Sequence, residues 1–172
     1  RGRAGAWGGN GSTGPTQCDA GTYRGAAGGA SAADCDATPP GYYTSEGSAA
    51  PTACGGPSLF CPGGEGQPRT VGDGFETFTN ASLAGAPTDV DNTATRTSQR
   101  PASPGFFSAG GIEQPCGGSS LFCPGGEGEP RTVDDGFETF TDTTLPGAPG
   151  DPHGTSTRTS QRACSGGAYC EA

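Results

Sequence analysis

Cysteine is the residue type with the clearest chemistry in this 172-residue sequence. Two close pairs of cysteines each enclose six residues, and a third pair encloses five. Structural zinc sites favour cysteines that are roughly two to four residues apart. The observed spacing, in an acidic and Gly-rich chain, is instead typical of a disulfide framework made in an oxidising, secreted compartment. The eight cysteines are Cys18, Cys35, Cys54, Cys61, Cys116, Cys123, Cys164 and Cys170.

An internal repeat dominates the sequence. Residues 54–100 align without a gap with residues 116–162, and 35 of the 47 aligned positions are identical. Similarity at a fixed period is the mark of a repeat array, whose units are too small to bury a hydrophobic face alone. The repeat divides the chain into a Gly-rich N-terminal arm, a cysteine-rich module and two repeats, with the boundaries 1–17, 18–53, 54–115 and 116–172.

The repeat also favours one pairing of the cysteines. Where the second repeat has Cys164 and Cys170, the first has Ala102 and Ser108, so both cysteines of this pair are missing together. The first repeat then keeps only two cysteines, so we expect them to bond to each other. The second repeat has cysteines at the same two positions, so we expect the same bond there. The favoured bonds, among the many connectivities that eight cysteines allow, are Cys54–Cys61, Cys116–Cys123 and Cys164–Cys170, with Cys18 and Cys35 as the remainder.

The composition disfavours several classes of function. The chain has 34 Gly and 16 Pro, but only eight Val, Ile and Leu residues in total and eight Phe. Because so few large side chains cannot build a private core or an enclosed pocket, we expect a protein that is not an enzyme and holds no cofactor. No apolar run is long enough to span a membrane. The net charge of −9 argues against a nucleic-acid partner.

The local sequence predicts short strands and turns with almost no helix. Residues 75–79 and 137–141 mix aromatic, Thr and charged side chains as strands do, and an Asp-Gly pair before each is typical of a hairpin turn. The Thr-rich stretches 93–97 and 155–159 add a second β-prone segment to each repeat. We therefore expect a small, disulfide-rich, mostly β/coil fold, an elongated tandem repeat of short hairpins.

Other polar residues give weak signals for catalysis or metal binding. His153 is the only His and has no nucleophile near it in the sequence, which is typical of a loop residue. Glu76 and Glu138 lie one repeat apart on different units, which disfavours a two-carboxylate hydrolase. The acidic clusters 89–91 and 134–135 lack the spacing of calcium loops and are typical of turns. We predict no catalytic residue and no metal site.

Two asparagines are candidates for covalent modification. The sequons at Asn80 and Asn10 mark surface loops that can carry N-linked glycans in a secreted chain. The stretches 84–104 and 143–160, rich in Thr, Ser and Pro, also suit O-glycosylation. Glycans would help to order a chain with so little apolar surface, because they would cover exposed backbone.

Five residues are candidates for contacts between subunits. Trp7 is the only bulky residue of the arm, and it is either exposed to solvent or an anchor inserted into a neighbouring copy; we favour the anchor. Four arginines recur with the repeat, and they either form a solvated edge or bridge acidic groups across a subunit contact. These are Arg96, Arg100, Arg158 and Arg162.

Several short words recur in order along the chain. They are C-x-x-G-x-Y at 18–23, P-G-Y-Y-T at 40–44, C-P-G-G at 61–64 and 123–126, and C-S-G-G-A-Y-C at 164–170. Together they resemble the ephrin-receptor-like cysteine-rich repeats of large surface proteins in algae and other protists. The resemblance covers about residues 18–170 and implies a disulfide-stapled extracellular module that acts as a spacer, adhesive or fibre component. The chain departs from that pattern at Ala102 and Ser108.

These observations predict a structural subunit of a secreted extracellular filament or surface coat, such as a flagellar hair or wall filament. Its copies would polymerise through repeat-to-repeat contacts, where the Phe side chains would find cover. The expected partners are copies of the chain itself, with no nucleic acid and no membrane span in this segment. The alternative is the stalk or ligand-binding ectodomain of a cell-surface receptor. Because the sequence has neither an initiator Met nor a signal peptide, we expect a processed chain or a fragment.

Overall fold

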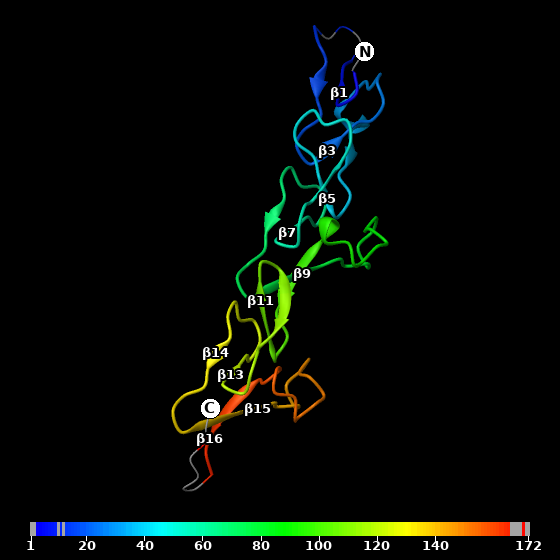
Figure 1. Ribbon diagram of the computed structural model, residues 1–172. Coiled ribbons are helices and arrows are strands. Elements are labelled where there is room, and N and C mark those ends of the chain that lie inside the picture. The colour runs from blue at the N-terminus through cyan, green and yellow to red at the C-terminus, as the bar shows by residue number, and fades with distance from the viewer. Residues whose placement is uncertain (1–2, 10, 12, 166–169, 171–172) are drawn as a thin grey trace. The chain divides into compact units, whose positions relative to one another are not determined.

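The computed structural model describes residues 3–9, 11, 13–165 and 170, and it consists of short antiparallel strand pairs joined by turns and loops (Figure 1). Helix is confined, in these residues, to two 3-10 turns of three residues each, η1 (Ala32–Asp34) and η2 (Thr93–Thr95). Gly and Pro are the least favourable residues in a helix, and they punctuate the whole chain. The predicted small, disulfide-rich β/coil fold of tandem hairpins is confirmed.

The described residues form sixteen strands, and each odd-numbered strand pairs only with the next one, so every sheet has two strands. We call each pair a hairpin. Because a lone two-stranded hairpin is marginally stable in water, each one depends on its neighbours and on cross-links. The strands are β1 (Ala6–Trp7), β2 (Thr16–Gln17), β3 (Thr22–Tyr23), β4 (Asp36–Ala37), β5 (Tyr42–Tyr43), β6 (Thr52–Ala53), β7 (Leu59–Phe60), β8 (Arg69–Thr70), β9 (Phe75–Phe78), β10 (Ser98–Pro101), β11 (Phe106–Ala109), β12 (Ile112–Pro115), β13 (Leu121–Phe122), β14 (Arg131–Thr132), β15 (Phe137–Phe140) and β16 (Ser160–Ala163).

The chain divides into two compact units. Unit 1 contains Arg1–Thr70 and Thr77–Ser98, and unit 2 contains Val71–Glu76 and Gln99–Ala172. The division passes through the hairpin of β9 and β10, inside the sequence repeat 54–115. Compact units and sequence repeats are therefore different divisions of this chain.

A backbone hydrogen bond to a glycine closes the open end of most hairpins. Gly74 lies directly before β9, and its carbonyl oxygen accepts a 2.9 Å bond from the N–H of Ala102, directly after β10. The glycine has a φ of 74°, in the left-handed region that glycine enters without steric cost. Gly5, Gly21, Gly41, Gly105 and Gly136 accept in the same way from Cys18, Thr38, Cys54, Cys116 and Cys164.

Within each unit, neighbouring hairpins are joined through their backbones. In unit 1 the N–H of Gly21, before β3, donates to the carbonyl of Thr44, after β5, at 2.8 Å. In unit 2, a parallel bridge links Phe107 of β11 to Glu127 in the loop between β13 and β14. Backbone bonding of this kind needs no large side chain, which suits a chain with few of them.

The closest approaches between hairpins require glycine. A Cβ on Gly74 would lie 2.2 Å from the carbonyl oxygen of Gly126, in the loop between β13 and β14, where no carbon atom fits. Gly126 in turn donates its N–H to the carbonyl of Ala102 at 2.8 Å. In unit 1 the corresponding distances are 2.0 Å for the pair Gly5–Gly47 and 2.3 Å for the pair Gly21–Gly64.

Four disulfide bonds staple the hairpins: Cys18–Cys35, Cys54–Cys61, Cys116–Cys123 and Cys164–Cys170. They join the cysteines as the parity argument predicts. The Cα atoms of the four pairs lie 5.8 to 6.1 Å apart, within the usual range for disulfides. Each short loop is expected to gain about 2–3 kcal/mol, mainly through restriction of the unfolded chain.

The interior consists mainly of cystine and hydroxyl-bearing side chains. Thr97 and Thr159 are fully buried, and each accepts a 2.7 Å hydrogen bond from a backbone N–H, of Asn80 and of Asp142 respectively. Among the eight Phe, only Phe60 and Phe122 are buried, and the other six are half-buried. Hydrogen bonds make such buried hydroxyls tolerable, although the buried Oγ1 of Thr95 finds no partner among the described residues. Other buried residues are Cys18, Cys54, Cys61, Cys116, Cys123, Thr44 and Ser108.

Two local predictions are wrong. The Thr-rich stretches 93–97 and 155–159 are not strands, because the strands after them begin at Ser98 and Ser160. At the first stretch, the Asn92 side chain accepts a 2.9 Å bond from the Ala94 N–H and starts the 3-10 turn η2. Second, the Asp73-Gly74 turn does not close a hairpin. It connects β8 to β9, which belong to different sheets, and the Asp135-Gly136 turn likewise connects β14 to β15.

The described part of the arm, residues 1–17, contains a hairpin of the same kind as the rest. β1 and β2 pair with Ala6 opposite Gln17 and Trp7 opposite Thr16. Ala6 is buried, with 1% of its surface exposed.

We expect Gly74→Ala to cost about 3 kcal/mol or more, because its Cβ would overlap the carbonyl of Gly126. Gly136→Ala is the matched control: its φ is also positive, at 80°, but no described atom lies within 4 Å of the added Cβ. The control should cost only the roughly 1–2 kcal/mol of a left-handed alanine. The N–H groups of Ala102 and Cys164 bond to the carbonyls of Gly74 and Gly136, so the loss of amide hydrogen-exchange protection at these two residues measures the destabilisation caused by each variant. Equal losses of protection would contradict the steric argument.

Candidate functional site

The edge at which one hairpin meets the next is the best candidate for a binding surface, because it offers backbone groups and a close-fitting glycine. We define the stacking edge of a hairpin as the glycine before its first strand and the two residues that follow. In unit 2, the stacking edge of hairpin β9–β10 is residues 74–76. The carbonyl of Phe75 accepts a 2.8 Å bond from the Ser108 hydroxyl, and Glu76 forms a parallel bridge with Gly111.

Two of the four predicted contact arginines bond to glutamates of the same chain. Arg100 forms an ion pair with Glu76, and the Nε of Arg162 donates to Oε1 of Glu138 at 2.7 Å. Arg162 also lies over the ring of Phe140, 5.2 Å from its centroid. Both arginine side chains are about three-fifths exposed, at 59% and 62%, and ion pairs so exposed contribute about 0–1 kcal/mol. A role in subunit contact stays a prediction for both.

The other two arginines are held in loops by their backbones. The carbonyls of Arg96 and Arg158 each accept a 2.9 Å bond, from the N–H groups of Cys61 and Cys123 respectively. The Nη1 of Arg96 also donates to the carbonyl of Val90 at 3.2 Å. The Nε atoms of both arginines are buried and find no partner among the described residues. Their recurrence is thus explained in part by local structure.

Asn80 begins a turn that the second repeat makes with aspartate. Oδ1 of Asn80 accepts bonds from the N–H and hydroxyl of Ser82, at 3.1 and 2.6 Å. Asp142 accepts from the same two groups of Thr144, at 3.0 and 2.6 Å. The turn therefore needs only the oxygen of the side chain, and the amide nitrogen of Asn80 has no role in it. The second sequon, at Asn10, lies outside the described residues.

Trp7 lies in a hairpin rather than in a free tail. It is half-buried, and it forms a parallel bridge with Gly29, whose backbone packs against the Trp7 side chain. A Cβ on Gly29 would lie 3.1 Å from the Cβ of Trp7. An intramolecular contact thus accounts for part of its buried surface, and its role as an anchor in a second copy stays a prediction.

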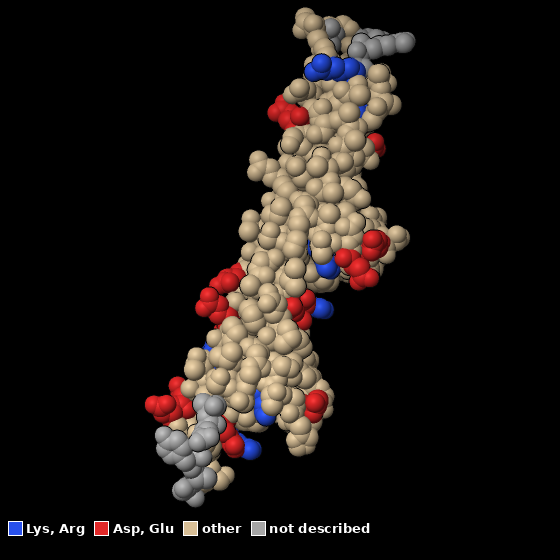
Figure 2. All heavy atoms as spheres, viewed as in Figure 1, with Lys and Arg blue, Asp and Glu red and all other residues tan. Residues whose placement is uncertain are grey.

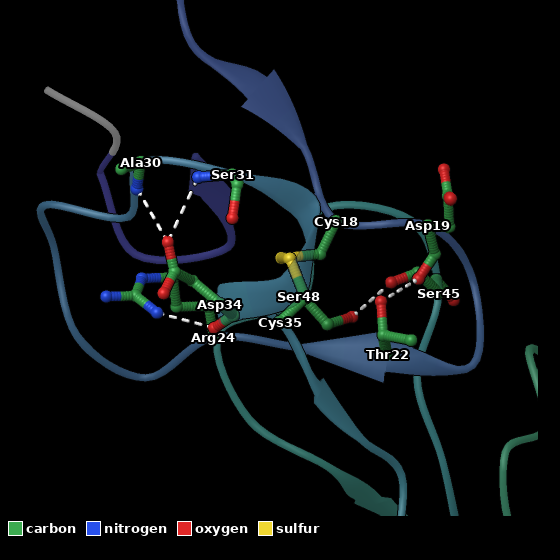
Figure 3. The surroundings of a disulfide bond; sticks show 10 residues. All are labelled: Cys18, Asp19, Thr22, Arg24, Ala30, Ser31, Asp34, Cys35, Ser45 and Ser48. Carbon is green, nitrogen blue, oxygen red and sulfur yellow. Dashed lines mark hydrogen bonds between the residues drawn. A yellow bond between two sulfur atoms is a disulfide. The ribbon is translucent and has the colours of Figure 1, made fainter. Parts of the chain in front are cut away.

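The loop closed by Cys18–Cys35 is ordered by one carboxylate (Figure 3). Oδ2 of Asp34 accepts bonds from the N–H groups of Ala30 and Ser31, at 2.7 and 3.0 Å, and Arg24 donates to the Asp34 carbonyl. The bond from Ala30, then that from Ser31, lowers the pKa of Asp34 below its ordinary value, and the positive charge of Arg24 adds to the effect. The ionised carboxylate here is part of the turn itself.

The described residues contain no group of three or more His, Cys, Asp and Glu side chains that could hold a metal ion. His153 donates its backbone N–H to Oδ1 of Asp151 at 2.9 Å, in an exposed turn. In the acidic cluster 89–91, the side chain of Asp89 accepts in the same way from the N–H of Asp91. Charged side chains on the visible face lie in small separate groups among neutral atoms (Figure 2).

Sequence reasoning missed the glycines that shape the stacking edges. Their signal was present, since a glycine stands two residues before Trp7, Tyr23, Tyr43 and Phe107. The second members of the close pairs, such as Gly126, lie in loops rich in glycine. Nothing local in the sequence distinguishes them from their neighbours.

Compared with known proteins, the chain matches no protein-family model and no curated protein sequence. None of the helices in the described residues has the length and apolar character needed to cross a membrane.

The turns at Asn80 and Asp142 should respond differently to acid. The hydroxyl and then the N–H of Thr144 lower the pKa of Asp142 below 3.8, so the ionised turn is fully stabilised above that value and loses stability as the pH falls through the lower, folded pKa. We expect the Thr144 amide resonance to titrate with a midpoint below 3.8, and the Ser82 amide not to follow. Asp142→Asn should remove the titration. A midpoint at or above 3.8 would refute the assignment.

Proposed function

We propose that the chain is a structural, non-catalytic subunit of a secreted extracellular filament or surface coat, whose copies polymerise through contacts like those between its own hairpins. The observation that carries the proposal is how the hairpins are covered. They pack against neighbours through backbone bonds and glycine contacts, as at Gly74 and Gly126, rather than around a large apolar core. A surface that serves to stack one hairpin on another can also stack one copy on another.

The half-buried aromatic residues support the same proposal. Six of the eight Phe side chains are only half-buried, although benzyl groups gain free energy when they are removed from water. Contacts between copies would cover more of this surface. Heterologous contacts of this type, in which two different surfaces meet, produce open chains unless the geometry closes them into rings.

The four disulfide bonds support an extracellular location, because such bonds form and persist in oxidising compartments. The resemblance to ephrin-receptor-like cysteine-rich repeats in protist surface proteins, carried by words such as C-P-G-G, points the same way. We therefore place the filament at a cell or flagellar surface.

Assembly of the oxidised chain tests the proposal. We expect sedimentation velocity to show a weight-average mass that rises above the 16.8 kDa of one chain as the concentration increases, and negative-stain electron microscopy to show filaments. Reduced and alkylated chain is the control and should remain monomeric, because the hairpins lose their staples. A mass of 16.8 kDa at every concentration would reject the filament and favour the receptor stalk.

We also propose a glycan on Asn80, whose sequon lies in an exposed turn and whose amide nitrogen the turn does not use. Chain secreted from eukaryotic cells should carry a mass increment that peptide N-glycosidase removes. Asn80→Asp is the matched variant, because Asp142 makes the same turn in the second repeat. It should lose the increment at this site and keep its fold. An intact wild-type mass of 16.8 kDa would contradict the prediction.

A further inference from the structure

Three positions along the chain share one backbone arrangement. Thr38, Ala102 and Cys164 each follow directly after the second strand of a hairpin, and each donates its N–H to the carbonyl of the glycine before the first strand. These bonds are 3.0, 2.9 and 3.0 Å long. We define the joint of a hairpin as this closing residue together with the residue six positions further along. The three joints are Thr38 with Thr44, Ala102 with Ser108, and Cys164 with Cys170.

A later loop binds both residues of the first joint and of the second. In the second joint, the carbonyl of Ala102 accepts a 2.8 Å bond from the N–H of Gly126. The N–H of Ser108 donates to the carbonyl of the next loop residue, Glu127, at 2.9 Å. The loop between β7 and β8 makes the same two bonds to the first joint, at 2.8 and 3.0 Å. Adjacent residues of one loop therefore hold the two members of each joint close together.

The side chains of a joint meet wherever both of them can bond. In the first joint the two threonine hydroxyls are hydrogen-bonded to each other, and in the third the two cysteines form a disulfide. In the second joint Ala102 has no group that can bond. The hydroxyl of Ser108 instead donates to the carbonyl of Phe75, in the hairpin that Ala102 closes, at 2.8 Å. The three joints therefore make one connection in three chemical ways.

The first two joints have no covalent bond across them. The four disulfide bonds use all eight cysteines, and none joins hairpin β3–β4 to β5–β6 or hairpin β9–β10 to β11–β12. The four residues of these two joints are at most 3% exposed, and none has a large apolar side chain. Opening such a joint therefore moves little apolar surface of the joint itself into water. Segments with few buried apolar contacts are those that open locally at low free energy.

We propose that the first two joints are reversible hinges, in the place where Cys164 and Cys170 form a permanent one. A hinge opens when its hydrogen bonds are exchanged for bonds to water, and it closes again with every disulfide intact. Two cysteines placed at either joint convert the hinge to the permanent form. Their thiols give up two protons and two electrons to a glutathione disulfide, which becomes two glutathione thiols.

Paired cysteine variants test the two hinges independently. Ala102→Cys with Ser108→Cys addresses the second joint, and Thr38→Cys with Thr44→Cys addresses the first. Each chain is oxidised with glutathione disulfide, peptide mapping identifies the bonds formed, and amide hydrogen exchange measures opening. Ala102→Thr with Ser108→Thr is the matched control, because it installs the hydroxyl pair of the first joint without a covalent bond. Ser103→Cys with Ser108→Cys moves one thiol a single residue out of the joint.

We expect each joint pair to form its own disulfide beside the four native bonds, and the pair with Ser103 to remain as free thiols. With the second joint locked, the Ser108 and Gly126 amides should exchange about tenfold or more slowly than in wild type. The threonine control should slow them far less. Cysteines that stay free at both joints, or that displace native bonds, would overturn the shared arrangement. A disulfide that leaves exchange unchanged, or a threonine control that slows it as much, would overturn the hinge.

Discussion

The rest of this structure depends on one constraint: the backbones of packed hairpins approach so closely at glycine pairs that a methyl group would not fit between them. Gly74 and Gly126 approach so closely that no side chain fits between them, and two further pairs in unit 1 do the same. Such contact lets the N–H and carbonyl groups of neighbouring hairpins bond directly, as between Gly126 and Ala102. With those backbone groups satisfied, strands of two residues suffice, and large side chains are dispensable.

The side chains that remain inside are those that tolerate a polar environment. Buried threonines, such as Thr97 and Thr159, accept hydrogen bonds from backbone N–H groups. The buried cystines fill interior volume and need no hydrogen-bond partner. At the positions of Ala102 and Ser108, a hydrogen bond in one repeat takes the place of a disulfide bond in the other. The second repeat has a disulfide there, and in the first Ser108 instead donates to the Phe75 carbonyl.

Much of this fold could be predicted from the sequence, because the repeat and the composition can both be read over the whole chain without knowledge of the contacts between distant residues. Parity identified the disulfide pairs, and residues such as Phe75 and Phe137 marked true strands. The glycine pairs could not be predicted, because each joins loops that are far apart in sequence and no local pattern marks the partner. The Thr-rich stretch at 93–97 misled for a related reason: β propensity gives way where a side-chain cap such as Asn92 starts a turn.

The loops that follow β9 and β15 are the longest connections between paired strands in the described residues, and neither contains a cysteine. Residues 79–97 and 141–159 each connect two paired strands without a disulfide, whereas Cys54–Cys61 closes a span of only seven residues. Under tension, a loop that is closed by a disulfide bond can add almost nothing to the end-to-end length of the chain. Each unstapled loop holds about 65 Å of chain at full extension. A filament of such subunits would be inextensible at low load and would lengthen in discrete steps once these strand pairs part, absorbing mechanical work without breaking a covalent bond.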